Sequence, residues 1–152
     1  MKLATLCYLK KNNETLMLYR CKKPGDTHIG KWNGLGGKVE AGETPEQCAI
    51  REVQEESGLT VTDLKLHGVI TFPMFDGIDD WYVFVFTMTE FEGEMIESPE
   101  GELDWIPDDK LMELNLWEGD RIFLPWIQGG RFFSAKFNYI TKKLIDWSVN
   151  FY

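Results

Sequence analysis

Residues Gly37–Leu59 read GKVEAGETPEQCAIREVQEESGL, and this stretch decides the fold. It satisfies the pattern G-x5-E-x7-R-E-U-x-E-E-x-G-U, where U is an aliphatic residue, at every fixed position. The fixed residues are Gly37, Glu43, Arg51, Glu52, Glu55, Glu56 and Gly58. If each type occurred at roughly 7%, as glycine does on average, chance would satisfy the whole pattern at about one start in 10^8. Coincidence is therefore excluded.

The stretch is predicted to form a loop, a helix and a second loop. Thr44 suits the N-cap, and Pro45 suits the first helical position, where its missing N–H costs nothing. Ser57-Gly58 ends the segment with the residue type that is favoured just past a helix. At about 3.6 residues per turn, one helix face is acidic and the opposing one is apolar. The acidic face carries Glu52, Glu55 and Glu56, and the apolar stripe carries Ala49, Ile50 and Val53.

The acidic face has two interpretations. Like charges three and four residues apart destabilise an isolated helix, so such a face is either well solvated or organised around cations. An ordinary acidic surface helix is the plainer alternative. The glycine-rich loop before the helix, together with Glu43 and Arg51, favours a metal site. Oxygen ligands of this kind suit Mg²⁺ or Mn²⁺.

The pattern resembles the Nudix box, the signature of hydrolases that cleave a nucleoside diphosphate linked to a further moiety. The resemblance implies that Arg51 pairs with Glu43 and holds the loop against the helix. It also implies metal ligands at Gly36, Glu52 and Glu56, with Glu55 close by. We therefore predict a catalytic set of Glu43, Arg51, Glu52, Glu55 and Glu56, in which Glu52 and Glu56 are both candidates for the general base.

Within that family the chain is more similar to the MutT-like enzymes, which hydrolyse oxidised purine nucleoside triphosphates. Residues 32–39, WNGLGGKV, match that branch with one aromatic-to-leucine change. Further matches fall in the same register at Phe72, Glu97, Ser98, Glu100, Trp105 and 117–120. The resemblance implies that Glu100 is an additional metal ligand. Its alternative is one more exposed acid in a run that includes Glu97 and Glu102.

A base-binding slot needs apolar, flat surfaces that stack on the base and a few polar groups that select it. Core packing is the alternative for any one aromatic residue, because aromatics make up 14% of the chain. Asp120 is preceded by Gly119, where the mammalian-type members have a second acid, and His28 is left out of the site. The predicted substrate-binding residues are Asn33, Gly37, Lys38, Phe72, Met74, Trp81, Trp117 and Asp120.

Length and composition restrict the class of protein. The 152 residues suit a single domain over 1–152. A net charge of −9 disfavours polymeric nucleic acid as a partner, and no apolar run approaches the length of a membrane span. Cys7, Cys21 and Cys48 are too few and too scattered for a disulfide framework or a zinc site, which fits a cytoplasmic protein. We expect a nucleotide substrate and a monomer or weak homodimer.

Hydrophobic periodicity predicts an α/β protein, and the resemblance implies the Nudix fold, an α/β/α sandwich with a mixed sheet. Besides the box helix, short helices are expected over 108–114 and 120–128, and a long loop over 22–37. The expected strands are 2–9, 16–21, 64–74, 81–91, 131–139 and 142–149.

The predicted function is Mg²⁺-dependent hydrolysis of 8-oxo-dGTP to the monophosphate and pyrophosphate. Two alternatives remain open from the sequence. One is hydrolysis of another nucleoside diphosphate derivative, such as an ordinary dNTP, a dinucleoside polyphosphate or ADP-ribose. The other is a nucleotide-binding module without catalysis, which the intact set of acids in the box disfavours.

Overall fold

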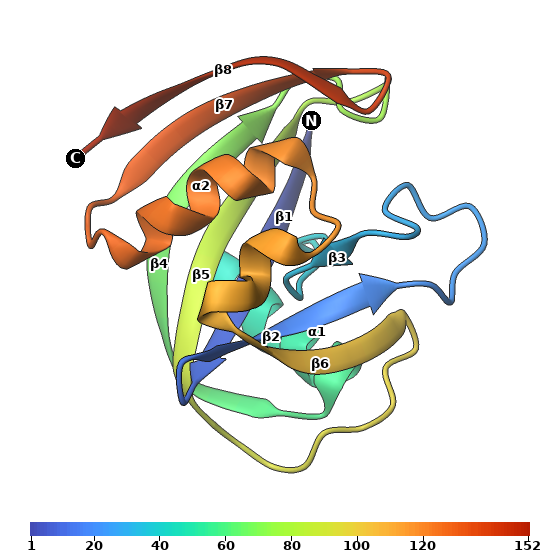
Figure 1. The fold of residues 1–152 in the computed structure, drawn as a ribbon, viewed down its shortest axis with the longest axis vertical. Helices are drawn as coiled ribbons and strands as arrows, with labels where there is room; N and C mark the ends of the chain where they lie inside the picture. Colours follow the sequence, from blue (N-terminus) through green and yellow to red (C-terminus); the bar gives the residue numbers. More distant parts are fainter.

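The computed structural model describes residues 1–152, and its ribbon is drawn in Figure 1. In chain order the elements are β1 (Lys2–Lys11), β2 (Glu14–Arg20), β3 (Trp32–Asn33), α1 (Pro45–Ser57), β4 (Thr60–Phe72), β5 (Trp81–Glu92), β6 (Gly101–Pro107), the 3₁₀ helix η1 (Asp108–Glu113), α2 (Glu118–Gln128), β7 (Phe133–Ile140) and β8 (Lys143–Phe151). None of the helices is long and apolar enough to cross a membrane.

The strands form one 8-stranded mixed sheet. Its main order is β3-β2-β1-β5-β4-β7-β8, and β6 pairs with β2 outside this path. The pairs β1–β5 and β4–β7 are parallel, whereas the remaining pairs are antiparallel. Parallel neighbours require a connection that crosses over the sheet, and α1 lies in the first of these crossovers.

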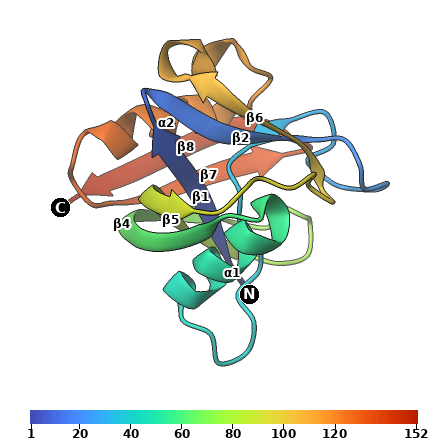
Figure 2. The ribbon, with the colours of Figure 1, turned by 90° about the horizontal axis from the view of Figure 1, so that it is seen from below.

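The two α-helices cover opposite faces of the sheet. Figure 1 shows α2 in front of β4 and β5, and Figure 2 shows α1 on the other side of these strands. Each face has its own core. On the α2 side, Phe123 packs with buried residues of β7 such as Phe137, and on the α1 side, Ala49 and Val53 pack with Phe86. The predicted α/β/α sandwich with a mixed sheet is confirmed.

Helix α1 begins and ends where the local sequence predicts. Thr44 is the N-cap, its hydroxyl accepts from the Gln47 N–H at 3.1 Å, and the Gln47 side chain accepts from the Thr44 N–H at 2.9 Å. Pro45 is the first helical residue, and Gly58 is the C-cap. The predicted apolar stripe also lies against the sheet, since Ala49 and Val53 are fully buried.

Two features of the fold differ from the sequence prediction. The sequence prediction contains no counterpart of strand β6, because its acids, Glu102 and Asp104, mask the apolar residues beside them. The two acids are the outward residues of an alternating strand that pairs with β2 along its whole length. The expected long loop also contains β3, a strand of two residues that is too short to give a periodic signal. The other boundaries agree with the prediction to within four residues.

Candidate active site

The glycine loop before α1 is held against β1 by backbone hydrogen bonds. Cys7 N–H donates to the Leu35 carbonyl at 2.6 Å, and Thr5 N–H donates to the Gly37 carbonyl at 2.8 Å. Gly36 has a φ of +135°, and a Cβ atom there would lie 2.1 Å from the Thr5 carbonyl oxygen. At Gly37 a Cβ atom would lie 2.5 Å from the Glu52 carboxyl carbon. Only glycines let this backbone lie so close both to β1, at Gly36, and to the acidic face of α1, at Gly37.

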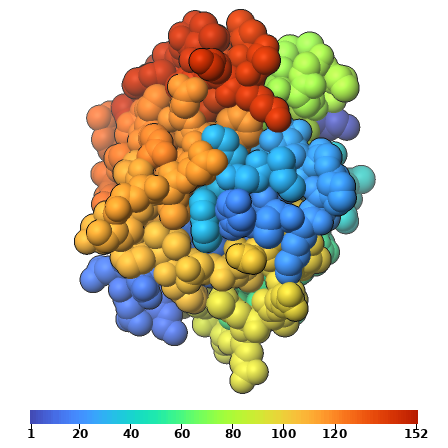
Figure 3. Space-filling model, turned by 45° about the vertical axis from the view of Figure 1, so that its right-hand side comes forward, coloured from blue at the N-terminus to red at the C-terminus, as the bar shows by residue number.

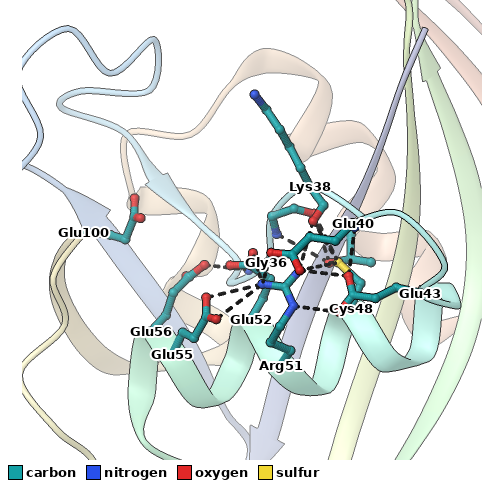
Figure 4. A network of polar contacts seen from close by, with 12 residues as sticks. Gly36, Lys38, Glu40, Glu43, Cys48, Arg51, Glu52, Glu55, Glu56 and Glu100 are labelled. Carbon is teal, nitrogen blue, oxygen red and sulfur yellow. Dashed lines mark hydrogen bonds and ion pairs between the residues drawn. The ribbon is translucent and has the colours of Figure 1, made fainter.

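Arg51 lies at the centre of the ion pairs that join the loop to α1, as Figure 4 shows. Its Nε and Nη2 donate to the two oxygens of Glu43 at 2.7 and 3.0 Å, which is the pairing that the sequence predicts. Nη2 also donates to the Lys38 carbonyl at 3.1 Å, and Nη1 donates to Glu52 at 2.8 Å. The contact with Glu55 is longer, at 3.3 Å, and that side chain is 59% exposed. The pairing of Arg51 with Glu43 lowers the pKa of Glu43 to about 2.

Glu56 is the buried acid of the box. Its Oε1 accepts from the Gly36 N–H at 3.3 Å, and its Oε2 is buried without any hydrogen-bond partner. Burial, followed by the negative charge of Glu52, raises the pKa of Glu56 to about 9. A buried carboxyl oxygen without a partner is costly unless a ligand satisfies it. Glu56 therefore faces a position that favours a positively charged group.

Glu100 lies directly before β6, apart from the Arg51 network (Figure 4). Its carboxylate pairs with Arg20 Nη2 at 2.9 Å and with Lys23 Nζ at 2.5 Å. Arg20 also pairs with Asp26, with 2.9 Å between Nε and Oδ2. The predicted ligand thus lines the same cavity as Glu52 but is neutralised by two cationic side chains.

The predicted metal ligands are only partly assembled. No group of three or more His, Cys, Asp or Glu side chains is arranged to hold a metal ion, because Glu52 pairs with Arg51 and Glu100 pairs with Arg20 and Lys23. The donors nevertheless fit a hard divalent cation in kind, since they are the carboxylates of Glu52 and Glu56 and the backbone of Gly36, and Oε2 of Glu56 has no partner. Gly36, Glu52 and Glu56 are the residues that would hold it.

A cavity of about 680 Å³ extends from the glycine loop to a cluster of aromatic side chains. This volume suits a ligand of nucleotide size. Most of the predicted site lines it, and only Glu43, Arg51, Glu55, Glu56 and Met74 do not. The predicted residues in its wall are Asn33, Gly36, Gly37, Lys38, Glu52, Phe72, Trp81, Glu100, Trp117 and Asp120.

The aromatic end of the cavity contains residues that the sequence prediction missed. Phe75 lies with its ring centroid 5.2 Å from that of Trp117 and 5.3 Å from that of Tyr139. Met74, which was predicted here, is 52% exposed and has a φ of +47°, because the turn after β4 directs the next residue inward instead. His28 also lines the cavity. The alternation of apolar residues at Phe133, Ala135, Phe137 and Tyr139 is the sequence signal that places Tyr139 on the inner face of β7, and these four residues are buried.

Two polar side chains, Asn33 and Asp120, lie buried at this aromatic end of the cavity. We call this end the slot, and it consists of these two residues and the aromatic residues Phe72, Phe75, Trp117 and Tyr139. The Asn33 amide nitrogen is buried without a partner. Asp120 is 6% exposed, and none of the protein's hydrogen bonds reaches its carboxylate. Burial raises the pKa of Asp120 to about 7, although Lys31 and Arg121 oppose this shift. Both side chains therefore retain unused hydrogen-bonding capacity.

Trp81 and Lys38 lie together at the rim of the cavity. The Lys38 Nζ is 5.5 Å from the centroid of the Trp81 ring, which is within range of a cation–π contact. Trp81 Nε1 donates to Asp76 at 3.0 Å, so the indole is held from the turn between β4 and β5. Both predicted residues thus border the cavity without belonging to the slot.

Comparison with known proteins agrees with the fold. A model of the NUDIX domain matches residues 2–127. The chain is 44% identical over 96 residues to an oxidized purine nucleoside triphosphate hydrolase of Danio rerio, covering 63% of this chain and 62% of that protein. It is 36% identical over 110 residues to the protein of the same name from Mus musculus, covering 72% and 70%.

A solved structure extends the similarity to the whole chain. The mutator MutT protein of Bacillus halodurans is 33% identical and superposes with a TM-score of 0.86, covering 99% of this chain and 98% of that chain. The chain therefore belongs to the Nudix hydrolase family. Hydrolases of this family act on phosphoanhydride bonds and generally use a divalent metal.

Proposed function

We propose that this chain hydrolyses oxidised purine nucleoside triphosphates, 8-oxo-dGTP in particular, to the monophosphate and pyrophosphate with Mg²⁺ or Mn²⁺. The observation that carries the proposal is that one cavity extends from Glu52, on α1, to the slot. In the slot, the side chains of Asn33 and Asp120 are buried without hydrogen-bond partners. The names of the Danio rerio and Mus musculus relatives support the same substrate class.

The reaction is a substitution at phosphorus. The oxygen of a water molecule forms a bond to the α- or β-phosphorus, the anhydride bond between these phosphates breaks, and its electron pair stays with the departing oxygen. Glu52 and Glu56 are the two candidates that accept the proton of the water, since both flank the Gly36-Gly37 backbone. Glu56 could act as the base only with the cation bound, because a nearby positive charge would offset the burial that raises its pKa. When bound, the divalent cation neutralises the phosphates and lowers the pKa of the attacking water.

Selection of the base rests on the slot. The Asn33 side chain offers both a donor and an acceptor to a purine edge. Because the pKa of Asp120 is about 7, its carboxyl group is partly protonated near neutral pH and can donate as well as accept. Stacking between aromatic rings supplies affinity for any base, whereas these polar groups reject a base that leaves them unpaired.

A turnover panel tests the proposal. We expect 8-oxo-dGTP to be hydrolysed with a higher kcat/KM than dGTP, dinucleoside polyphosphates and ADP-ribose, and we expect a chelator to abolish turnover. In ¹⁸O-labelled water, the label should appear in the monophosphate or pyrophosphate. Label found only in orthophosphate from the γ position would overturn the mechanism. Equal kcat/KM for dGTP and 8-oxo-dGTP would overturn the substrate assignment.

A further inference from the structure

His28 is part of the cavity wall, and neither the box nor the predicted slot includes it. It lies in the segment between β2 and β3, which Figure 3 shows in blue against the orange segment before α2. This segment is anchored by polar contacts. The His28 N–H donates to Asp26 Oδ1 at 3.0 Å, and its carbonyl accepts from the Lys31 N–H at 2.9 Å. The position of the His28 ring is therefore set from its own backbone.

The His28 ring packs among the aromatic side chains of the slot. It stacks on Phe75 with a centroid distance of 6.1 Å and an interplanar angle of 16°. It also meets Trp117 edge-on at 5.6 Å. The Trp117 Nε1–H donates to His28 Nδ1 at 2.9 Å, which satisfies the polar atom of an indole that is only 5% exposed. His28 thus determines how the indole is oriented in the slot.

This hydrogen bond fixes the tautomer of His28. An indole N–H is a donor only, so Nδ1 must accept, and the proton of a neutral imidazole then lies on Nε2. Burial, followed by the positive charges of Arg20 and Lys142, lowers the pKa of His28 to about 4, and Asp26 opposes this shift. The ring is consequently neutral near pH 7. Its Nε2–H has no acceptor within the protein, although the ring lines the cavity.

We propose that His28 is a specificity-determining residue of the slot, which orients Trp117 through Nδ1 and donates its Nε2–H to an acceptor atom of a bound purine nucleotide. The inference rests on the proposed function in one respect, namely that the base occupies the slot. The Nε2–H of His28 is then a further hydrogen-bond donor to the base, in addition to the side chains of Asn33 and Asp120. Asp26 accepts from the His28 N–H and from Arg20, and Arg20 also pairs with Glu100. These contacts connect the slot to the acidic end of the cavity, where Glu52 and Glu100 lie.

Steady-state kinetics of matched variants test this assignment. His28→Phe keeps a ring to stack on Phe75 but removes both nitrogens. His28→Asn keeps an acceptor near Nδ1, and His28→Gln keeps a donor near Nε2. We expect KM for the preferred nucleotide to rise about 10-fold in His28→Phe, because one or two hydrogen bonds to a buried partner are lost. The two amide variants should show smaller increases, and kcat should change less than KM in all three.

Ile29→Ala is the control, since Ile29 is the next residue of the same segment and is 49% exposed. It should keep the wild-type KM. If His28→Phe also keeps KM within about twofold of wild type, the proposal is overturned. If the apparent kcat falls in proportion to a loss of folded protein, as measured by circular dichroism, and KM is unchanged, His28 has a purely structural role and the proposal is likewise overturned.

Nuclear magnetic resonance gives a readout that is independent of turnover. The chain contains 2 histidines, so the ring signals that disappear in His28→Phe assign His28 directly. Long-range ¹H–¹⁵N spectra should show an unprotonated Nδ1 and a protonated Nε2, and the Nε2 signal should shift when a non-hydrolysable purine nucleoside triphosphate saturates the protein. A proton on Nδ1, or an unchanged Nε2 signal at saturation, would contradict the proposal.

The test separates this inference from the proposed function. The preferred nucleotide is first identified with the wild-type protein. If it is not an oxidised purine nucleoside triphosphate, the proposed function fails, and the same KM criterion is applied to His28 with the nucleotide that is preferred. If 8-oxo-dGTP is preferred and His28→Phe leaves KM unchanged, the proposed function stands and only the role of His28 fails.

Discussion

The two ends of the cavity are built in different ways. At the acidic end, Glu52 lines the cavity, and Glu43, Arg51 and Glu56 come from the same loop and helix without lining it. Arg51 pairs with Glu43 and Glu52, and Glu56 accepts from the Gly36 N–H. The slot instead collects residues from the ends of β3, β4 and β7, from the turn after β4, and from the N-cap and first turn of α2. It is apolar and leaves its polar groups unpaired. We infer that bond cleavage and base selection are separable by mutation, because they rest on different segments.

Removal of an acid of α1 should have the largest effect and should act on bond cleavage. Glu56→Gln and Glu52→Gln should each lower kcat by at least about 10²-fold, because each removes a metal ligand or the general base. Glu46→Gln, on the exposed first turn of the same helix, should keep the wild-type kcat. Circular dichroism should be unchanged throughout. Near wild-type turnover of either variant in Mg²⁺ would refute the role of that residue.

The same contrast explains what the sequence could predict. The caps of α1, its acidic face and the Arg51–Glu43 pair depend on spacing within one segment, so they are visible in the sequence. The choice between Met74 and Phe75 depends on the geometry of a turn, which periodicity does not describe. The pairing of Glu100 with Arg20 and Lys23 depends on strand β6, which the sequence prediction missed.

Asp120→Asn tests whether the acid in the slot is truly buried. Burial raises the pKa of Asp120 from its ordinary value of 3.8 to about 7, so the folded state binds this proton more tightly than the unfolded state. The stability that Asp120 contributes is full below its ordinary pKa and is lost as the pH rises through 7. The free energy of unfolding of Asp120→Asn, relative to wild type, should therefore increase by about 2–3 kcal/mol between pH 5 and pH 8.

Urea denaturation at several pH values measures this difference. A difference that stays constant from pH 5 to pH 8 would show that Asp120 is hydrated or paired in the folded protein. In that case the slot would resemble the acidic end of the cavity, and the contrast between the two ends would be lost.

Asp120→Ala tests whether the slot selects between 8-oxo-dGTP and dGTP. Loss of a buried polar partner costs about 1–3 kcal/mol, so kcat/KM for 8-oxo-dGTP should fall roughly 10- to 10²-fold. The same change should affect dGTP less, so discrimination should shrink. Both nucleotides are measured with the same preparation. Equal losses would mean that Asp120 supports the fold or the phosphate end, and the substrate assignment would return to the general Nudix one.

Trp117→Ala should have a smaller and less selective effect. Stacking on an aromatic side chain is worth about 1–3 kcal/mol per base and is tolerant of base identity. We expect kcat/KM to fall about 10-fold for both 8-oxo-dGTP and dGTP. Trp105→Ala is a matched control, because that indole stacks on Phe91 and does not line the cavity. A loss confined to 8-oxo-dGTP would mean that Trp117 reads the base rather than only stacking on it.

The smallest expected effect belongs to the cap of α1. Thr44→Ala removes the hydroxyl that accepts from the Gln47 N–H, and loss of an N-cap side chain typically destabilises a protein by about 1 kcal/mol. Thr44→Ser keeps the hydroxyl and should restore most of that stability. Because Arg51 still pairs with Glu43 and Lys38, the acidic face should keep its position, so kcat and KM should remain near wild type. Urea denaturation and steady-state kinetics on the same samples measure both quantities. A fall in kcat of more than about tenfold in folded Thr44→Ala would show that the cap, and not the Arg51 network, holds the acids of α1 against the glycine loop.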